Sequence, residues 1–460
     1  MASHKLTLWL LLVVSLQPWG CIEDPAQITT NFGVSPDAGV QDTGFKDVGS
    51  LDTANLDVAE VDVATDPDIA DAHTPDVCAP QSCASAALVC GTLADDGCGQ
   101  PLVCGQPTCV RDVSLGIRHS CALLRDGAVY CWGDNLHFQL GNTNAEPQPL
   151  PTRVANLWAE DIDVGHYHSC ALTTQGALQC WGHNSRGQIG LPPENPVQQA
   201  EGNEILASAE QIFAGFEDHS CALADSKLYC WGQGSLYRLG NNSTADNHVP
   251  THILDDVLSV ASGQHHGCAL VSSGQIWCWG SAEYFQNGDA LGQPTPALVA
   301  SLSDDNLHIG AGQDHSCVVK PAGRLWCWGR NNAGQLGPNA DVARSAAPIE
   351  VTGFEPATVI QQVDAGVAHT CALGSHGKVW CWGRNNLFQL GDGTLEDSPV
   401  PKLVEDLPHP AVSLASGWNH NCVIDTQAEL RCWGHNAYGQ LGDGLLVNRE
   451  LAFKVEFPDP

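Results

Sequence analysis

Apolar and polar residues alternate along most of the chain from residue 110 onward, in short runs on either side of tight turns. In the stretch HSCALLRDGAVYCWG, residues 119–133, small or apolar side chains alternate with polar ones before and after Asp126-Gly127. Alternation with a period of two indicates β-strands, and a Gly-containing turn between two such runs indicates an antiparallel hairpin. Further strand-like runs precede and follow the hairpin, so we expect it to lie within a larger sheet.

This hairpin recurs six more times at a spacing of about 50 residues, and every copy ends in Cys-Trp-Gly. A repeat of this length predicts an array of small sheets, and we number the hairpins repeats 1 to 7 in chain order. The turn of repeat 3 is one residue shorter, at Asp225-Ser226, which predicts a two-residue loop. Repeat 7 has Ala428 where most turns end in Gly, so we expect mild backbone strain there.

Two cysteines flank the turn of every hairpin at equal distances from its centre. Directly opposed residues in an antiparallel pair have Cα atoms about 4.5–5.5 Å apart, which is within reach of a disulfide. Each bond would close a short loop, so its stabilisation by chain entropy is just under ~3 kcal/mol at most. The predicted disulfides are Cys121–Cys131, Cys170–Cys180, Cys221–Cys230, Cys268–Cys278, Cys317–Cys327, Cys371–Cys381 and Cys422–Cys432.

A histidine stands two residues before the first cysteine of each hairpin, on the same face of the strand. With the two cysteines it would supply three zinc ligands, but no fourth ligand recurs and the C-x-x-C spacing common in zinc sites is absent. We therefore expect hydrogen-bonded structural histidines, with zinc as the alternative, and predict no metal or other cofactor. The histidines are His119, His168, His219, His266, His315, His369 and His420.

The pattern G-x-x-H-x-C-A-L … G-x-V-x-C-W-G-x-N-x-x-G-Q-L-G resembles the repeat of the regulator-of-chromosome-condensation family. The resemblance covers residues 110–460, although repeat 3 has Gly234 in place of Asn and repeat 4 lacks the Gln-Leu-Gly spacing. It implies an all-β fold, a seven-bladed β-propeller of four-stranded blades. A last strand-like run, residues 451–457, follows the seventh hairpin. We expect it to pair with the first blade and close the ring, which would remove an exposed edge.

The segments before the propeller differ from it in composition. Residues 1–20 have a basic flank at Lys5 and a short apolar run, which predicts a secretory signal peptide. Cys21 follows Gly20 as the lipidated cysteine of a bacterial lipoprotein does. We expect lipidation there, with plain cleaved secretion and an unprocessed anchor as alternatives.

Two linking segments follow the signal. Residues 21–77 are acidic and poor in hydrophobic residues, which predicts a disordered tether. A short pentapeptide-repeat helix and calcium binding are the weaker alternatives for this tether. Residues 78–109 contain six cysteines, which predicts a small disulfide module whose pairing stays open among fifteen connectivities.

Charge and motifs exclude several functions. The formal net charge is −33, from 52 acidic and 19 basic residues, and the basic footprint of a nucleic-acid-binding protein is absent. The namesake of the family acts in the nucleus on a small GTPase and on chromatin, which disulfides and a signal peptide oppose. We predict an extracytoplasmic monomer (an outer-membrane lipoprotein, a cell-surface or a secreted protein) that contacts the membrane only through its lipid anchor. The chain has no G-x-S-x-G, H-E-x-x-H or P-loop motif, so we predict no catalytic residues and no enzyme.

The order of strands predicts where binding occurs. The loop before each hairpin and the loop after each Trp-Gly must lie on the same face of the disc, and both carry aromatic residues. Exposed aromatic residues often anchor protein interfaces, so we predict binding of an unknown extracellular protein or glycan there. The candidate residues are Tyr167, Phe216, Trp418, Phe138, Tyr237, Tyr284, Phe388 and Tyr438. Packing of these side chains between blades is the alternative.

The resemblance supports the same face. A secreted propeller of similar repeat number, a β-lactamase inhibitor, uses such a loop face to bind a protein. The alternative function is an extracellular hydrolase or a carbohydrate-binding lectin with its site on this face.

Overall fold

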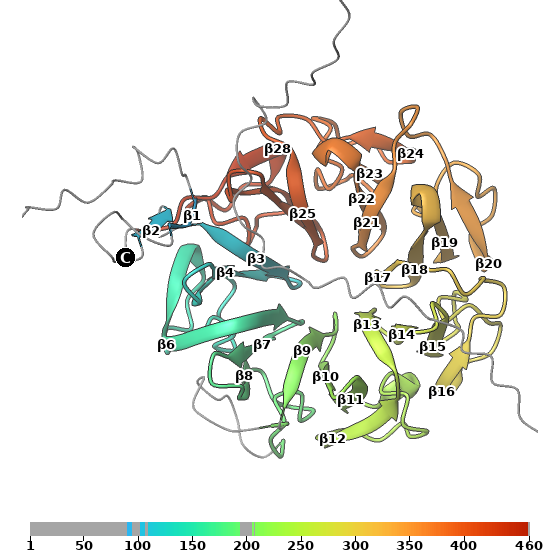
Figure 1. The fold of residues 1–460 in the computed structure, drawn as a ribbon, viewed down its shortest axis with the longest axis horizontal. Helices are drawn as coiled ribbons and strands as arrows, with labels where there is room; N and C mark the ends of the chain where they lie inside the picture. The colour runs from blue at the N-terminus through green and yellow to red at the C-terminus, as the bar shows by residue number, and fades with distance from the viewer. Residues whose placement is uncertain (1–89, 94–101, 106–108, 194–204, 207, 459–460) are drawn as a thin grey trace, which may run out of the picture.

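The computed structural model describes residues 90–93, 102–105, 109–193, 205–206 and 208–458. These residues form β-strands, loops and three short 3-10 segments, and the sheets surround a central axis (Figure 1). The predicted all-β propeller is confirmed. The predicted signal peptide (1–20) and tether (21–77) lie outside the described residues. Of the cysteine-rich segment (78–109) the structure describes an antiparallel pair, β1 (Cys90–Leu93) and β2 (Leu102–Gly105), together with Cys109.

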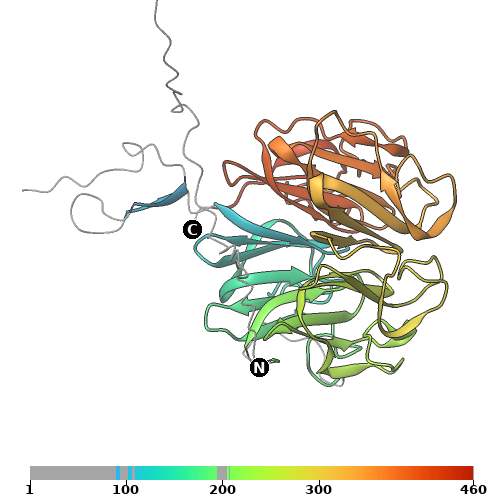
Figure 2. The ribbon, with the colours of Figure 1, turned by 45° about the vertical axis from the view of Figure 1, so that its right-hand side comes forward.

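Each repeat begins with an inner strand beside the axis and continues with the hairpin, and in every repeat except the second the described residues end with an outer strand at the rim (Figures 1 and 2). The inner strands are β3 (Val110–Leu115), the end of β6 (Gln148–Val164), β9 (Ala209–Ala214), β13 (Val257–Ser262), β17 (His308–Ala311), β21 (Ile360–Ala365) and β25 (Ala411–Ser416). The outer strands are the start of β6, β12 (Asn247–Leu254), β16 (Gln293–Leu298), β20 (Arg344–Val351), β24 (Ser398–Leu403) and β28 (Arg449–Lys454).

The hairpins lie between the inner and the outer strands. Their strands are β4 (His119–Leu124) and β5 (Ala128–Gly133), β7 (His168–Thr173) and β8 (Leu178–Gly182), β10 (His219–Ala224) and β11 (Lys227–Gly232), β14 (His266–Val271) and β15 (Ile276–Gly280), β18 (His315–Lys320) and β19 (Arg324–Arg330), β22 (His369–Gly374) and β23 (Val379–Gly383), and β26 (His420–Asp425) and β27 (Leu430–Gly434). The 3-10 segments are η1 (Ser235–Tyr237), η2 (Pro321–Gly323) and η3 (Ser375–Gly377). Among the described residues no helix is long and apolar enough to cross a membrane.

The prediction of seven separate four-stranded blades is wrong. The described strands around the axis form six sheets, five of four strands and one of six. The larger sheet joins repeats 1 and 2 because β6 continues for 17 residues, pairing first with β5 and then with β7. Residues 152–164 contain no Pro or Gly that would end the strand. Asn156, at a φ of 58°, lies within this continuous strand. After β8 the chain enters residues 194–204, outside the described part.

The two cysteines of every hairpin are direct cross-strand partners. Their Sγ atoms are 2.01–2.13 Å apart and their Cα atoms 4.0–4.1 Å apart, somewhat closer than the expected separation. All seven predicted pairs are therefore at disulfide distance. Both Asp225 and Ser226 have positive φ, at 52° and 58°, as a two-residue loop requires, and Ala428 has the expected positive φ, at 57°.

The core consists of tryptophans that bridge neighbouring repeats. The tryptophan of each Cys-Trp-Gly is at most 1% exposed and packs in one cluster with the hairpin cysteines of the preceding repeat. Trp181 of repeat 2, for example, shares a cluster with Cys121 and Cys131 of repeat 1. The same relation joins Trp132 of repeat 1 to the cysteines of repeat 7, so the ring closes with the same contacts that join its other repeats.

The prediction that residues 451–457 pair with the first blade is also wrong. Strand β28 pairs with β27 and completes the last sheet, because β6 already supplies the outer strand of repeat 1. The residues after β28 contribute to closure through side chains instead. The ring of Phe457 lies edge-on to Tyr130 and Trp132 of repeat 1, with centroids 5.5 Å and 6.0 Å apart.

Deleting residues 449–460 is expected to lower the melting temperature of the whole propeller. The deletion removes β28 and takes Val455 and Phe457 out of the cluster between repeats 7 and 1. Phe457 is half-buried, so loss of its phenyl group should cost less than the roughly 3–5 kcal/mol of a fully buried ring. Truncation after Phe457 is the control. An unchanged melting transition for the longer deletion would refute the role assigned to these residues.

Candidate functional site

The loop after each Trp-Gly is fixed by its own asparagine and glutamine side chains. In repeat 1 the Oδ1 atom of Asn135 accepts a hydrogen bond from the main-chain N–H of Leu140 at 2.8 Å. Oε1 of Gln139 accepts one from the N–H of His137 at 2.9 Å. Repeats 6 and 7 repeat both bonds. These contacts satisfy the loop backbone internally, so the intervening side chains are presented on a rigid support.

Repeat 3, where the sequence departs from the pattern, uses a different support. Gly234 and Arg238 stand in place of the asparagine and glutamine. The buried guanidinium of Arg238 donates to the main-chain oxygen and to Oγ of Ser235, and lies 3.3 Å from a carboxylate oxygen of Glu217. Arginine thus holds this loop through charge-assisted bonds.

The main-chain oxygen of the loop glutamine also joins each repeat to the next. The oxygen of Gln139 accepts hydrogen bonds from Nε1 of Trp181 at 2.9 Å and from Oγ of Ser169 at 2.8 Å. Nε2 of His119 lies 2.9 Å from the same Ser169 Oγ. Because the serine proton is directed at Gln139, the histidine must donate, which makes it the neutral Nε2–H tautomer.

We call this set of contacts between neighbouring repeats, from the histidine to the hydroxyl group and from the hydroxyl group to the loop carbonyl, the joint. It recurs around the ring. The corresponding histidine pairs are His168–Ser220, His266–Ser316, His315–Thr370, His369–Asn421 and His420–Ser120. The pair His420–Ser120 links repeat 7 to repeat 1. Repeat 4 has Gly267 at the hydroxyl position, because a Cβ atom there would lie 2.4 Å from the ring of Trp279. The predicted structural role therefore fits the contacts of six of the seven histidines.

Burial fixes the charge of these histidines. It lowers the pKa of His119, His315 and His420 to about 3, and that of His168, His266 and His369 to about 4. Their Nδ1 atoms have no hydrogen-bond partner within the described chain. A protonated ring would therefore place an unsolvated charge inside the joint. The zinc alternative is not supported, because the hairpin sulfurs lie at bonding distance from one another.

Replacing Ser120 by Ala is expected to lower the free energy of unfolding by about 1–3 kcal/mol, because the buried Nε2–H of His420 loses its acceptor. The measurement is urea denaturation of the wild type and the variant at pH 7.5. Ser272→Ala removes an exposed hydroxyl and serves as the matched control. Equal stability of all three proteins would contradict the role of this joint.

The two loop sets lie on one face, as the strand order predicts. In repeat 1 the N–H of Asp134, after Trp-Gly, donates to the oxygen of Arg118 in the first loop at 2.9 Å. The same bond recurs in the other six repeats. We call this side of the disc the loop face. The loop-face aromatics fall into a central group, an axial pair and a rim group.

The central group surrounds Arg118 where repeats 7, 1 and 2 meet. The guanidinium carbon of Arg118 lies 4.4 Å from the ring centre of Tyr438 and 5.6 Å from that of Tyr167. His166 stacks on Tyr167 at 3.6 Å, and His137 lies 4.8 Å from the same ring. Two tyrosines and two imidazoles thus form one continuous, half-buried surface. A second cation–π contact, 4.5 Å between Arg330 and Tyr284, lies in repeats 5 and 4.

The axial pair is Phe216 and Trp418. Their rings meet edge to face at 6.2 Å, although they belong to repeats 3 and 7. Phe216 is 8% exposed and lines the axial cavity. The prediction that Phe216 is an exposed binding residue is therefore not supported by its burial; the pair instead packs across the axis.

The rim group occupies a position where the backbone favours glycine. Repeats 2, 5 and 7 have Gly187, Gly334 and Gly439 immediately before the loop glutamine. The other repeats have Phe138, Tyr237, Phe285 and Phe388 there, with φ between 59° and 67°. Positive φ costs a non-glycine residue about 1–3 kcal/mol and persists where the surroundings impose it. Tyr237 is the most exposed of the predicted residues, at 37%. The ring centre of Phe285 instead lies 4.6 Å from the guanidinium carbon of Arg344 in the next repeat. This contact matches the alternative prediction that the aromatic side chains pack between repeats.

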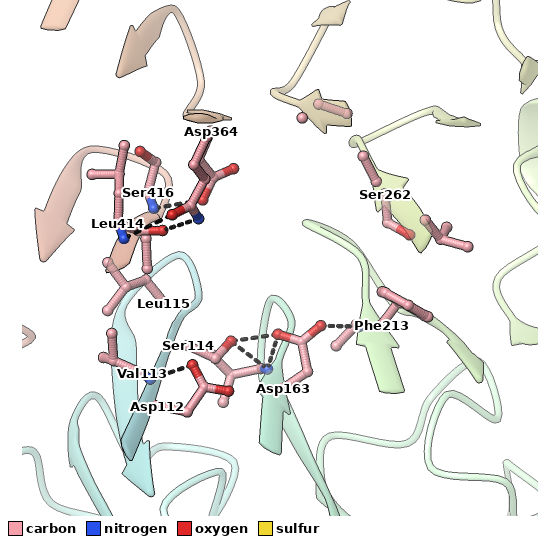
Figure 3. Close-up of a pocket in the computed structure, with 18 of the residues that line it drawn as sticks. Asp112, Val113, Ser114, Leu115, Asp163, Phe213, Ser262, Asp364, Leu414 and Ser416 are labelled. Atoms are coloured by element: carbon pink, nitrogen blue, oxygen red, sulfur yellow. Dashed lines mark hydrogen bonds between the residues drawn. The ribbon is translucent and has the colours of Figure 1, made fainter. Parts of the chain in front are cut away.

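The inner strands enclose an axial cavity of about 350 Å³, which the repeat pattern does not predict (Figure 3). Inner strands direct alternate side chains into it, and four of these are carboxylates: Asp112, Asp161, Asp163 and Asp364. One sequence pattern could have predicted this polar lining. Polar residues alternate with apolar ones in runs that otherwise resemble buried strands, such as D-I-D-V at residues 161–164. Among the described residues no group of three or more His, Cys, Asp or Glu side chains is arranged to hold a metal ion.

Hydrogen bonds from neighbouring strands hold these carboxylates. Asp163 accepts from Ser114 Oγ on one side and from the N–H of Ala214, at 2.7 Å, on the other. Asp364 accepts from the N–H of Ser416 at 2.8 Å. Burial raises the pKa of Asp112 and Asp163 to about 6 and that of Asp161 and Asp364 to about 7.

Comparisons with known proteins agree with this fold. Residues 91–355 match the model of the RCC1-like domain, and residues 376–424 match the regulator of chromosome condensation (RCC1) repeat. A second model of that repeat matches residues 360–389 and 411–440. The chain is 29% identical over 371 residues to the ultraviolet-B receptor UVR8 of Arabidopsis thaliana, covering 78% of this chain and 72% of that protein. It is 26% identical to human E3 ubiquitin-protein ligase HERC2 over 248 residues, 50% of this chain but 5% of that protein.

Solved structures share the fold at lower identity. Human WBSCR16 superposes with a TM-score of 0.61 and 23% identity, covering 70% of this chain and 88% of that one. A structure of Kap60 bound to yeast RCC1 (Prp20) gives a TM-score of 0.64 and 20% identity, covering 74% of this chain and 85% of that one. Since the RCC1-like domain model alone matches more than half of the sequence, this chain belongs to the RCC1-like domain family.

Proposed function

We propose that this protein is a non-enzymatic, extracytoplasmic binding module that recognises an extracellular protein through the loop face. The observation that carries the proposal is the rim group: aromatic side chains at positive φ, in a position where other repeats have glycine. Strained backbone positions cluster at functional sites, and aromatic residues contribute large contact areas at low entropic cost. The central group around Arg118 extends this surface toward the axis.

The location rests on separate observations. Seven cysteine pairs at disulfide distance favour an oxidising compartment. The apolar run before Cys21 favours export, and we propose that Cys21 carries a lipid that anchors a monomeric propeller to the membrane through the tether. Binding of Kap60 by yeast RCC1 (Prp20) supports protein recognition by a propeller of this shape, without indicating the partner of this one.

The test is cross-linking of the full-length protein on intact cells that produce it, followed by mass spectrometry. One variant replaces Tyr167, Tyr237 and Tyr438 by Ala; Phe216 is left intact because it is buried. Trp158→Ala is the matched control, because Trp158 is 43% exposed and adjoins the turn at Gly127, away from the loop face. We expect one specific cross-linked protein with the wild type and the control, and its loss with the triple variant.

Two outcomes would replace the proposal. A partner that remains with the triple variant and disappears with Trp158→Ala would place binding on the opposite face. Saturable binding of a polysaccharide, or its turnover, abolished by the triple variant would favour the lectin or hydrolase alternative on the loop face.

A further inference from the structure

We propose that Arg118 is the main polar contact of the loop face and that it binds a carboxylate group of the partner protein, from an Asp or Glu side chain. This inference rests on the proposed function, because it names the chemistry that the central group recognises. The side chain of Arg118 is 35% exposed, so its donors can be reached from outside. Arginine pairs with a carboxylate through two parallel N–H···O bonds, which add specificity to the charge attraction.

The guanidinium group of Arg118 lacks a strong acceptor within the described chain. The carboxylate at ion-pair distance is that of Asp134, whose Oδ2 lies 4.0 Å from Nη1, beyond the length of a hydrogen bond. The other oxygen of this carboxylate accepts from the main-chain N–H of Leu136 at 3.2 Å. Four other arginines of the loop face each donate a hydrogen bond to an oxygen atom of the protein: Arg186, Arg238, Arg330 and Arg344.

Two tyrosine rings hold Arg118 in place. Its guanidinium carbon lies 4.4 Å from the ring centre of Tyr438 and 5.6 Å from that of Tyr167. A cation–π contact uses the charge of the guanidinium group, so its N–H groups stay available to an acceptor. Because the rings restrict the side chain beforehand, less rotamer freedom is lost when a partner binds.

The neighbouring carboxylates are engaged by other groups. An oxygen of Asp218 lies 3.4 Å from Nδ1 of His183. The carboxylate of Glu217 lies 3.3 Å from a guanidinium nitrogen of Arg238. An incoming carboxylate therefore meets no competing hydrogen bond from these groups to Arg118.

The imidazoles around Arg118 add no negative charge to the site. Burial lowers the pKa of His137, His166 and His435, and the positive charge of Arg118 acts on each pKa in the same direction. The three rings are therefore neutral at pH 7.5, and Arg118 supplies the positive charge among them. Leu136, beside His137, is 62% exposed and offers an apolar contact next to this charge.

The probe is a phage-displayed library of random linear peptides, selected on the full-length protein at pH 7.5. We expect the enriched peptides to share an Asp or Glu residue. A synthetic peptide of the enriched sequence should bind saturably, at one molecule per chain. Changing its Asp to Asn, or its Glu to Gln, should weaken binding about tenfold or more, because a charge-assisted pair is lost.

Arg118→Gln should weaken binding of the same peptide about tenfold or more. Arg384→Gln is the matched control. Arg384 also lies on the loop face and has no carboxylate at ion-pair distance within the described chain, but no aromatic ring lies over it there. Melting temperatures of both variants monitor folding. Equal weakening by the two variants would show a general effect of charge and overturn the proposal, as would the absence of any enriched peptide.

Further outcomes separate this proposal from the proposed function. Enriched peptides without a shared acidic residue, lost on replacing Tyr167, Tyr237 and Tyr438 by Ala, would keep the loop face as the binding surface and overturn the role of Arg118. Peptides that still bind this triple variant would overturn both proposals. Saturable binding of polygalacturonate, lost with Arg118→Gln, would show that the carboxylate belongs to a glycan and overturn its assignment to a protein.

Discussion

Lowering the pH from 7 to 5 is expected to destabilise the propeller strongly, through the histidines that join its repeats. Each has an ordinary pKa near 6.5, and burial lowers that of six to about 3–4 and that of His219 well below the ordinary value. The folded state therefore keeps them neutral while the unfolded state takes up protons. The stability that they contribute is complete above pH 6.5 and is lost as the pH falls toward 4.

The axial aspartates act in the opposite direction. Their pKa of about 6–7 in the folded protein exceeds the ordinary 3.8, so they bind protons in the folded state first and favour folding as the pH falls below 7. Burial also lowers the pKa of His308 to about 4, so eight histidines oppose four aspartates, which leaves a net difference of about four protons near pH 5. At about 1.4 kcal/mol per proton and pH unit, the free energy of unfolding should fall by on the order of 5 kcal/mol per pH unit.

Urea denaturation at pH 7.5, 6.5, 5.5 and 4.5 measures this dependence. His119→Gln offers a side chain that can still donate a hydrogen bond to Ser169 but does not titrate. The slope of the free energy of unfolding against pH should therefore decrease by the contribution of about one proton. A denaturation midpoint that stays constant from pH 7 to pH 5 would show that the histidines are not held neutral in the fold.

Reduction of the seven hairpin disulfides is expected to unfold the protein at 37 °C. Each bond contributes just under ~3 kcal/mol at most by chain entropy. Their sum, on the order of 10 kcal/mol or more, is comparable with the whole stability of a typical domain, about 5–15 kcal/mol. Far-ultraviolet circular dichroism after reduction in urea and removal of the urea measures the effect. Recovery of the native spectrum and melting temperature with all cysteines reduced would contradict it.

The order of reduction is a further part of this expectation. Thirteen of the fourteen hairpin cysteines are at most 1% exposed, whereas Cys180 is 8% exposed. A reductant should therefore reach Cys170–Cys180 first, without global unfolding, and the other six bonds only as the ring opens. Alkylation at timed intervals, followed by mass spectrometry, would reveal the order, with Cys371–Cys381 as the buried reference. Simultaneous reduction of all seven would show that access to Cys180 is no easier.

Local chemistry made the hairpins predictable. The opposition of Cys121 and Cys131 depends only on the turn at Asp126-Gly127 and on the strand period, both of which are visible in a short stretch of sequence. The structural role of the histidines was also accessible, because seven copies of one residue in one position indicate folding rather than catalysis. Their partners were not, since Ser169 lies in the next repeat, 50 residues from His119.

The features that depend on how repeats meet were predicted poorly. Strand β6 runs without a break from the outer position of repeat 1 to the inner position of repeat 2. The connection between β12 and β13 also lacks Pro and Gly, yet it is interrupted at Asp255-Asp256, so composition alone did not predict the difference. The partner of β28 was misassigned because β6 had already filled the outer position of repeat 1. Phe216 was expected to be exposed, yet it packs against Trp418 from the far side of the ring, a contact that exists only once the ring is closed.

Disulfide mapping of the native protein by mass spectrometry tests the account most directly, because the oxidised hairpins support both the fold and the proposed compartment. Digestion without reduction, after blocking of free thiols, should yield seven cross-linked peptide pairs, each joining the two cysteines of one hairpin from Cys121–Cys131 to Cys422–Cys432. Blocked thiols at these fourteen positions, or zinc retained by them, would contradict it.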